Sequence, residues 1–443
     1  MADNEILRST ENPIERAFLV GVELRTEPGL LSVADSLDEL SLLSETTGLK
    51  VVGEVSQKLD KPNVATFIGR GKLAEVKALA EETLTNVVIF DNELSPRHLR
   101  EISKALGNNL RVIDRTALIL DIFAQHAVTH EGRLQVELAQ QEYRLPRLSH
   151  AWGHLERQGA GAAGRTGAVG GVGLRGPGET QLEVDKREIR KRIAFLKKQI
   201  AKISDHRSHY RVQRKRSQIP VIAIVGYTNA GKSTLLNQLA NADIYTADQL
   251  FATLDPTTRR VRLPGNHVGL FTDTVGFIQK LPTQLIAACK STLEEINEAD
   301  LLLHVIDASH FNAVAQFESV KDTLNEIQAD NIPMLNVFNK SDLLEDPEEA
   351  RQLLAETDSD AYLVSARTRE GIEALKRGIM EVLFERMVPI TVRLPFKQGA
   401  LIATFHEQGI IERVENEQNN VLIEGSIPGR LYTRYQEFTL KMT

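Results

Sequence analysis

The residues best suited to chemistry lie in one glycine-rich segment, which reads Gly-Tyr-Thr-Asn-Ala-Gly-Lys-Ser at 226–233. It follows an apolar, β-branched run at 221–225 and precedes a helical stretch at 234–239, the strand–loop–helix context of a phosphate-binding loop. Glycines let backbone N–H groups wrap the phosphates, while a lysine supplies a cation to the β and γ oxygens and a serine binds Mg²⁺. The sequence therefore predicts a nucleotide site made by Gly226, Tyr227, Thr228, Asn229, Ala230, Gly231, Lys232, Ser233 and Thr234.

A second motif, Asp273-Thr274-Val275-Gly276, follows a predicted strand at 268–271. Its aspartate is placed to hold the Mg²⁺ shell, and its glycine N–H is placed to meet the γ-phosphate. The next residue is Phe277, where many small GTPases have a glutamine that orients the attacking water. An apolar side chain cannot do this, so we expect slow intrinsic hydrolysis that a partner completes.

Two further motifs predict which base is bound. Asn339-Lys340-Ser341-Asp342 follows a predicted strand at 334–338, and a buried Asp342 carboxylate would accept two hydrogen bonds that guanine donates and adenine cannot. Ser365-Ala366-Arg367 follows a strand at 361–364 and is placed to bring a backbone N–H near guanine O6. All four motifs in GTPase order predict GTP as the nucleotide.

The segment between the first two motifs, 251–259, has the place of an effector loop. A threonine there completes the Mg²⁺ sphere only when the γ-phosphate is present, which makes such a loop a GTP sensor. The residues alone offer Thr253, Thr257 and Thr258 for this role. The predicted nucleotide-contacting part of the loop is Phe251, Ala252, Thr253, Leu254 and Asp255.

Residues 1–130 must form a separate unit, because short Val/Ile-rich runs alternate there with helical patterns. This alternation predicts a small, mostly parallel sheet covered by helices. A Gly-Arg-Gly-Lys segment at 69–72 lacks the Walker spacing, so a tight turn explains it better than a phosphate site. The expected strands are 18–24, 50–55, 65–68, 87–90 and 111–113, and the expected helices are 36–47, 72–84, 96–106 and 116–127.

Residues 131–217 are predicted to form an antiparallel helical hairpin. Apolar residues spaced four and three apart recur in both arms, as in a coiled-coil seam, and Pro146 should kink the first arm. The loop between the arms, 158–178, holds nine glycines and only two charges, Arg165 and Arg175. So long a loop is usually functional or disordered, and we expect it to be a working tip rather than a linker.

Charge is concentrated in the second arm. Residues 186–216 contain thirteen Lys/Arg and two acids, a charge of +11, while the whole chain has a net charge of −7. An acidic protein with one basic stripe is typical of a polyanion-binding protein that touches its partner in one place.

The composition excludes several classes of protein. The chain has 443 residues, 42% hydrophobic and 26% charged, and these values fit a globular protein of about three domains. One cysteine excludes a disulfide scaffold and fits a reducing compartment, and no apolar run approaches the ~18 residues of a membrane helix. The polar N-terminus does not resemble a signal peptide, so we expect a cytoplasmic protein, and we expect a monomer.

The segments GYTNAGKSTL, DQLFATLDPT, DTVGFI and RGPGETQLE together resemble the HflX family of bacterial ribosome-associated GTPases. The resemblance covers residues ~16 to 385 and implies that Thr253 is the Mg²⁺ threonine. It also implies binding to the ribosome through the 50S subunit and its rRNA, splitting of ribosomes under stress, and an N-terminal domain that binds ATP or RNA. Asn229 separately resembles the asparagine of potassium-activated GTPases, where K⁺ takes the role of an arginine finger. An ordinary P-loop side chain bonded to its own loop is the alternative, and both interpretations stay open.

The expected fold class is α/β: a P-loop GTPase domain at 218–387, preceded by the small α/β domain and the hairpin, and followed by a small α+β domain at 388–443. That last domain should have strands at 390–394 and 420–423 around a helix near 399–407. The expected function is hydrolysis of GTP by a ribosome-directed factor that uses Mg²⁺. The alternatives are an RNA-binding module that uses GTP only as an assembly switch, and ATP-dependent RNA remodelling by residues 1–130.

Overall fold

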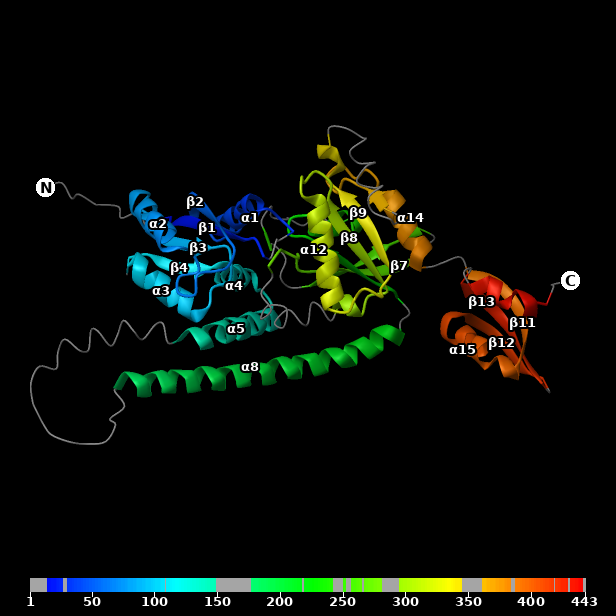
Figure 1. The fold of residues 1–443 in the computed structure, drawn as a ribbon. Coiled ribbons are helices and arrows are strands. Elements are labelled where there is room, and N and C mark those ends of the chain that lie inside the picture. The colour runs from blue at the N-terminus through cyan, green and yellow to red at the C-terminus, as the bar shows by residue number, and fades with distance from the viewer. Residues whose placement is uncertain are drawn as a thin grey trace, which may run out of the picture.

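A computed structural model describes most of the chain (Figure 1). The described residues are 14–26, 30–107, 109–148, 177–216, 219–241, 250–251, 256–264, 267–280, 295–344, 361–383, 387–417, 419–428 and 431–440. Thr253, Cys289 and the hairpin tip with Arg165 and Arg175 lie outside them. In this part of the chain, no helix is long and apolar enough to cross a membrane.

The N-terminal domain is a four-stranded parallel sheet between two helical layers. The strands run in the order β2-β1-β3-β4, with bounds Arg16–Leu24 (β1), Lys50–Leu59 (β2), Val87–Phe90 (β3) and Arg111–Asp114 (β4). One face packs against α1 (Val33–Thr46) and α4 (Arg115–His126), and the other packs against α2 (Arg70–Glu82) and α3 (Pro96–Leu106). The predicted parallel sheet and its four helices are confirmed.

The expected strand at 65–68 is wrong. Asn63 and Phe67 pair only through an isolated bridge, and the Asn63 side chain accepts hydrogen bonds from the N–H groups of Ala65 and Thr66. This local bonding satisfies the backbone as a turn at residues 63–67, which precedes α2.

The hairpin arms are α5 (His130–Arg144) and α8 (Pro177–Arg216), which lie side by side (Figure 1). A short 3₁₀ turn, Leu145–Arg147, follows α5 and contains Pro146, so the regular helix ends just where the proline removes an N–H donor. The predicted seam is present, because four buried residues join the two arms: Leu134, Leu138, Ile193 and Leu196. The opposite face of α5 packs into the N-terminal domain through Val136, Ala139 and Tyr143.

The third unit is a six-stranded sheet in the order β10-β9-β8-β5-β7-β6, with only β6 antiparallel. Helices α9 (Lys232–Leu239) and α14 (Ile372–Leu383) cover one face, and α12 (Ala313–Glu326) covers the other. The strands are Val221–Gly226 (β5), Thr257–Arg262 (β6), Val268–Asp273 (β7), Leu301–Asp307 (β8), Met334–Asn339 (β9) and Ala361–Leu363 (β10). This arrangement confirms the predicted P-loop domain and adds β6 and β8, which we did not predict.

The N-terminal domain and the P-loop domain share one hydrophobic core. Phe123 of α4 meets Phe251 edge to face, with ring centroids 4.7 Å apart. Tyr227, Phe277 and Ile278 belong to the same buried cluster as the leucines of α1 and α4. Both the P-loop and the segment after the Asp273–Gly276 motif therefore touch the N-terminal domain.

The C-terminal domain is a three-stranded antiparallel sheet in the order β11-β13-β12. One helix, α15 (Gly399–Gln408), packs its Phe405 against the sheet and against Tyr435. The predicted α+β fold is confirmed, with one strand, β12, added. The strands are Met387–Pro395 (β11), Ile410–Asn416 (β12) and Asn420–Pro428 (β13).

Candidate nucleotide-binding site

The P-loop joins the buried strand β5 to the N-terminus of α9. Asn229 and Gly231 have φ of 59° and 90°, in the left-handed region that asparagine and glycine tolerate best. A Cβ on Gly231 would lie 2.3 Å from Nδ2 of Asn339, so only glycine fits this close approach. The loop thus presents its backbone at a helix N-terminus, where N–H groups favour phosphate.

Lys232 begins α9, and its ammonium group is buried at the centre of the loop. The Nζ atom donates hydrogen bonds to the carbonyl oxygens of Gly226 and Tyr227, at 3.1 and 2.6 Å. Burial lowers the pKa of Lys232 to about 8, against the opposing effect of the nearby Asp273 carboxylate. The ammonium group is therefore a buried cation whose pKa lies closer to neutral pH than that of an ordinary lysine. A bound phosphate would favour its charged form.

Ser233 and Asp273 come together from α9 and the carboxyl end of β7. The Ser233 hydroxyl donates to Oδ2 of Asp273 at 2.6 Å. One hydroxyl and one carboxylate are hard oxygen donors, which fit Mg²⁺ because this ion takes its remaining ligands from phosphates and water. In the described part of the chain, no group of three or more His, Cys, Asp or Glu could hold a metal by itself.

The Asp273–Gly276 motif lies directly against the P-loop. A Cβ on Gly276 would come within 2.8 Å of the Thr228 side chain and 3.0 Å of Lys232 Nζ, so a side chain there would intrude on the phosphate position. The buried Thr274 hydroxyl instead donates to the Ile224 carbonyl at 2.7 Å, a structural bond. Phe277 is buried, and its N–H donates to the Gly226 carbonyl at 3.0 Å, so its ring belongs to the core.

Asn339 organises the end of the site where a base would bind. Its Nδ2 donates to the Ala230 carbonyl, and its Oδ1 accepts the Ala366 N–H, both at 2.9 Å. The side chain thereby ties the P-loop to the Ser365–Arg367 loop. Of the segment Ser365–Arg367, which was expected to bring a backbone N–H near guanine O6, the Ala366 N–H bonds to Asn339 in this structure. Lys340 has φ of 64°, and its ammonium pairs with Asp307 at 2.7 Å.

The expectation that Asp342 is buried is wrong. It lies in a 3₁₀ turn, Ser341–Leu343, at the carboxyl edge of the sheet, and its side chain is exposed. The buried Ser365 hydroxyl donates to Asp342 Oδ1 at 2.7 Å and holds the carboxylate at this edge.

The effector-loop threonines fall in two places. Thr257 and Thr258 lie in β6, and the Thr258 hydroxyl is 2.9 Å from that of Thr272 on β7. They are therefore part of an antiparallel strand pair and not of a loop. Phe251 is buried against the N-terminal domain, and Ala252, Thr253, Leu254 and Asp255 lie outside the described residues.

A buried polar network attaches the N-terminal domain to this site, and our sequence analysis did not find it. Arg115 is 2% exposed and bonds to Glu39 and, at 2.6 Å, to Asp91. Glu39 accepts a hydrogen bond from the Tyr227 hydroxyl, and Asp91 pairs with Lys280 Nζ. Two residues of the P-loop domain are therefore bound to carboxylates of the N-terminal domain. Burial alone would raise the pKa of Asp91, but Arg115 and Lys280 hold that pKa below its usual value. One signal was available, because Asp91 directly follows the fully buried strand β3.

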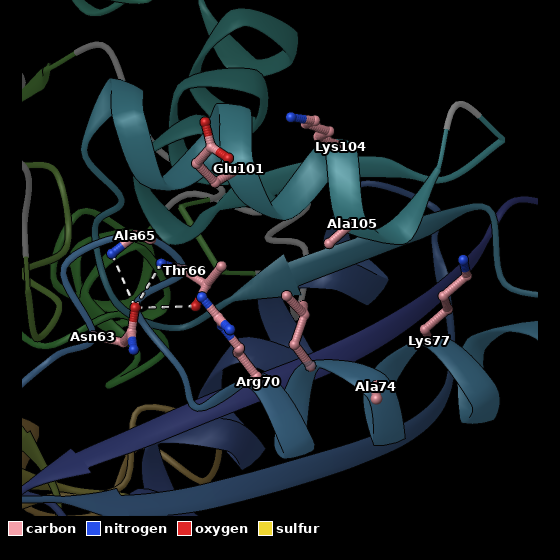
Figure 2. Close-up of a pocket in the computed structure, with 10 residues that line it drawn as sticks. Asn63, Ala65, Thr66, Arg70, Ala74, Lys77, Glu101, Lys104 and Ala105 are labelled. Atoms are coloured by element: carbon pink, nitrogen blue, oxygen red, sulfur yellow. Dashed lines mark hydrogen bonds between the residues drawn. The ribbon is translucent and has the colours of Figure 1, made fainter.

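A separate cavity of about 530 Å³ lies between α2 and α3, far from the P-loop in sequence. Figure 2 shows Arg70 of α2 reaching toward the Asn63–Thr66 turn, and it shows Glu101 and Lys104 on the neighbouring helix α3. Three cations line the cavity, Arg70, Lys77 and Lys104, together with one acid, Glu101. The tight turn expected at 69–72 is wrong, because Gly69 is the N-cap of α2 and residues 70–72 form its first turn. The Gly69 N–H donates to Oε1 of Gln57 at 3.1 Å.

Three protein-family models match consecutive parts of the chain. Their descriptions are "GTP-binding GTPase N-terminal" over residues 34–124, "GTP-binding GTPase Middle Region" over 126–214 and "50S ribosome-binding GTPase" over 221–340. The last model contains the P-loop, the Asp273–Gly276 motif and Asn339–Lys340.

Full-length relatives match along nearly the whole chain. The protein "GTPase HflX" of Alkalihalophilus pseudofirmus is 42% identical and covers 97% of this chain and 98% of the relative. "GTPase HflX" of Escherichia coli is 41% identical and covers 91% of each. A solved structure, "crystal structure of SsGBP and GDP complex", is 26% identical over 84% of this chain and 99% of that chain, with a TM-score of 0.46.

Proposed function

The chain belongs to the HflX family of GTPases, and from this premise we propose that it binds the large ribosomal subunit and splits ribosomes under stress. Its reaction is the hydrolysis of GTP to GDP and phosphate. The observation that carries the ribosome proposal is α8, a long helix whose exposed cations outnumber their acidic partners. We place this activity in the cytoplasm, the compartment of ribosomes.

In the proposed site, Lys232 binds the β and γ phosphate oxygens, and the Gly276 N–H meets the γ-phosphate. Ser233 binds Mg²⁺ directly, Asp273 holds its shell, and Thr253 completes the sphere when GTP is bound. The ion neutralises charge that develops on the phosphates when it is bound. The 2.6 Å contact between Ser233 and Asp273 supports this assignment. P-loop backbone groups from Gly226 to Thr234, and those of Phe251 to Asp255, Thr274 and Val275, surround the phosphates.

Guanine selection is assigned to Asp342, whose carboxylate accepts from the two guanine donors. Ser365 supports this role because it fixes one carboxylate oxygen and leaves the plane of the group oriented. Asn339 joins the three loops around the base, and Lys340, Ser341, Ala366 and Arg367 complete the wall.

Completion of hydrolysis is assigned to the ribosome. Phe277 is 4% exposed and packed into the core, so it cannot orient a water molecule in the way a glutamine does. A K⁺ ion bound near Asn229 is part of this proposal. In support, the Asn229 side chain is exposed and makes no hydrogen bond to another residue that the structure describes.

The test is GTP hydrolysis by the purified protein with and without ribosomes, in K⁺ and in Na⁺. We expect slow turnover alone, strong stimulation by ribosomes and a lower rate in Na⁺. Absence of stimulation would favour the alternative in which GTP is only an assembly switch for an RNA-binding module. Equal rates in the two salts would leave Asn229 a structural residue.

The hairpin is proposed to act by reaching a functional rRNA centre with its tip. Deletion of residues 160–176 should spare GTP binding and slow ribosome splitting, measured by sedimentation. A tip-deleted protein that splits ribosomes at the wild-type rate would make the loop a linker.

A second candidate function is ATP binding by the N-terminal domain. The cavity between α2 and α3 supports it, because three cations around about 530 Å³ suit a phosphorylated ligand of that size (Figure 2). Binding of ATP to the full chain should survive a change in the P-loop and be lost in Arg70→Gln. The opposite pattern would assign ATP to the GTP site.

A further inference from the structure

The most informative surface of α8 combines an aromatic ring with cations. Phe195 is 48% exposed, although the helix buries its neighbours Ile193 and Leu196 against α5. A single exposed phenylalanine needs no explanation by itself. Its position does, because it lies on the side of α8 that faces away from the seam.

Three lysines occupy the same row of the helix. Residues three, four and seven apart lie on one face, which places Lys191, Lys198 and Lys202 next to Phe195. All three are exposed, and none forms an ion pair with another residue that the structure describes. Lys198 and Lys202 repel each other at i,i+4. An exposed acid, Glu188, lies three residues before Lys191 at the N-terminal end of the same row.

The cations nearer the seam differ from this row. Arg192 donates two hydrogen bonds to Glu137 of α5, at 2.6 and 2.8 Å, and Lys197 pairs with Glu142 at 2.8 Å. These two basic residues are paired with acids of the first arm, beside the buried seam. The basic stripe thus contains two cations paired with α5 and a row that forms no ion pair with any residue whose placement the structure describes.

Arg192 also orders the ring. Its guanidinium carbon lies 5.4 Å from the Phe195 centroid, within the range of a cation–π contact. Because Glu137 fixes the guanidinium, the ring is held on one side and exposed on the other. A fixed aromatic surface between exposed lysines is the arrangement on which nucleic-acid bases stack.

We propose that Phe195 is a stacking platform for an unpaired RNA base, whose flanking phosphates contact Lys191, Lys198 and Lys202. A base inside a duplex has no free face, so the ligand must be a loop, bulge or single strand. Lys191 and Lys202 are about 16 Å apart along the axis, enough for several nucleotides. This inference deepens the proposed function, since it names the RNA element that the second arm reads.

The test compares two RNA probes with the full-length protein. One is a stem–loop with 2-aminopurine at an unpaired loop position, and the other is a perfect duplex of equal length. The variants are Phe195→Leu, Phe195→Trp and the combined change of Lys191, Lys198 and Lys202 to Gln. Phe311→Leu is the matched control, because Phe311 is a 76% exposed phenylalanine outside α8.

We expect Phe195→Leu to raise the stem–loop Kd about fivefold or more and to abolish the 2-aminopurine signal, with duplex binding and salt slope unchanged. Phe195→Trp and Phe311→Leu should bind as the wild type does. The lysine variant should weaken both probes and flatten the salt slope. The stacking role would be overturned if Phe195→Leu bound the stem–loop with the wild-type Kd, or if its Kd rose by the same factor for the stem–loop and the duplex.

Sedimentation with isolated large subunits separates this inference from the proposed function. Wild-type protein that binds the stem–loop through Phe195 but ignores the subunits would sustain the platform and overturn the ribosome proposal. If Phe195→Leu no longer bound the large subunits but still bound the stem–loop, Phe195 would contact a ribosomal protein. That result would overturn the stacking platform.

Discussion

The two ends of the nucleotide site are held by different parts of the molecule. At the base end, Asn339 and Ser365 bond within the P-loop domain, as far as the described residues go. At the phosphate end, Tyr227 and Lys280 bond to Glu39 and Asp91 of the N-terminal domain. The difference means that a change in the N-terminal domain should reach the phosphates without altering the choice of base.

The largest expected effect follows from Arg115→Met, which removes the buried counter-charge of Glu39 and leaves Asp91 with Lys280 alone. Breaking a buried pair from one side costs about 3–5 kcal/mol, so the free energy of unfolding in urea should fall by about that amount. Arg192→Met is the matched control, because its ion pair with Glu137 is half-exposed and an exposed pair contributes little to stability. A similar small loss for both variants would show that the network does not join the domains.

Asp342→Asn is the next largest change, and it acts at the base end alone. An amide cannot accept both guanine donors, so GTP affinity should fall by about tenfold to a hundredfold, while XTP, with an oxygen at C2, should bind better. Competition binding with GTP and XTP measures this. An unchanged preference would contradict the assignment of Asp342.

Much of the site around the base could be predicted from the sequence. Little could be predicted of the contacts by which the N-terminal domain supports the phosphate end. Motifs such as that at 339–342 are contiguous and carry their chemistry in residue type and spacing. Asp91, Arg115 and Lys280 come from three distant segments, and only the tertiary packing of two domains brings them together. The expected burial of Asp342 failed for a related reason, since exposure depends on where the turn meets the sheet edge.

The elements divide in the same way. Strands with long β-branched runs, such as β3 and β5, were predicted closely. β6 was missed because its sequence, Thr-Thr-Arg-Arg-Val-Arg, is polar and forms a sheet edge that needs only one buried residue, Val261. Pairing with β7 decides its conformation, and no local pattern reports that pairing.

Tyr227→Phe sharpens the comparison with a smaller change. It removes the hydroxyl that donates to Glu39 and accepts the Gln279 N–H at 2.9 Å, so the domains should lose about 1–2 kcal/mol of stability. The GTP-to-XTP preference should stay at the wild-type value, because the base end has no bond to Tyr227. A shifted preference would show that the two ends are coupled, contrary to the division proposed above.

The smallest expected effect is a pH dependence confined to the phosphate end. Burial lowers the pKa of Lys232 to about 8, so its ammonium is charged below that pH and loses its proton above it. Phosphate binding favours the charged form of Lys232. Above about pH 8, Lys232 must therefore take up a proton when GDP binds. Affinity for GDP should therefore be constant from pH 7 to 8 and should fall by up to about tenfold per unit above 8.

GMP is the matched control, because it has the same base but lacks the β-phosphate that Lys232 binds. Competition titrations from pH 7 to 9 should give a slope for GDP and none for GMP. Parallel slopes for the two nucleotides would assign the titration to the base end and would remove Lys232 as its source.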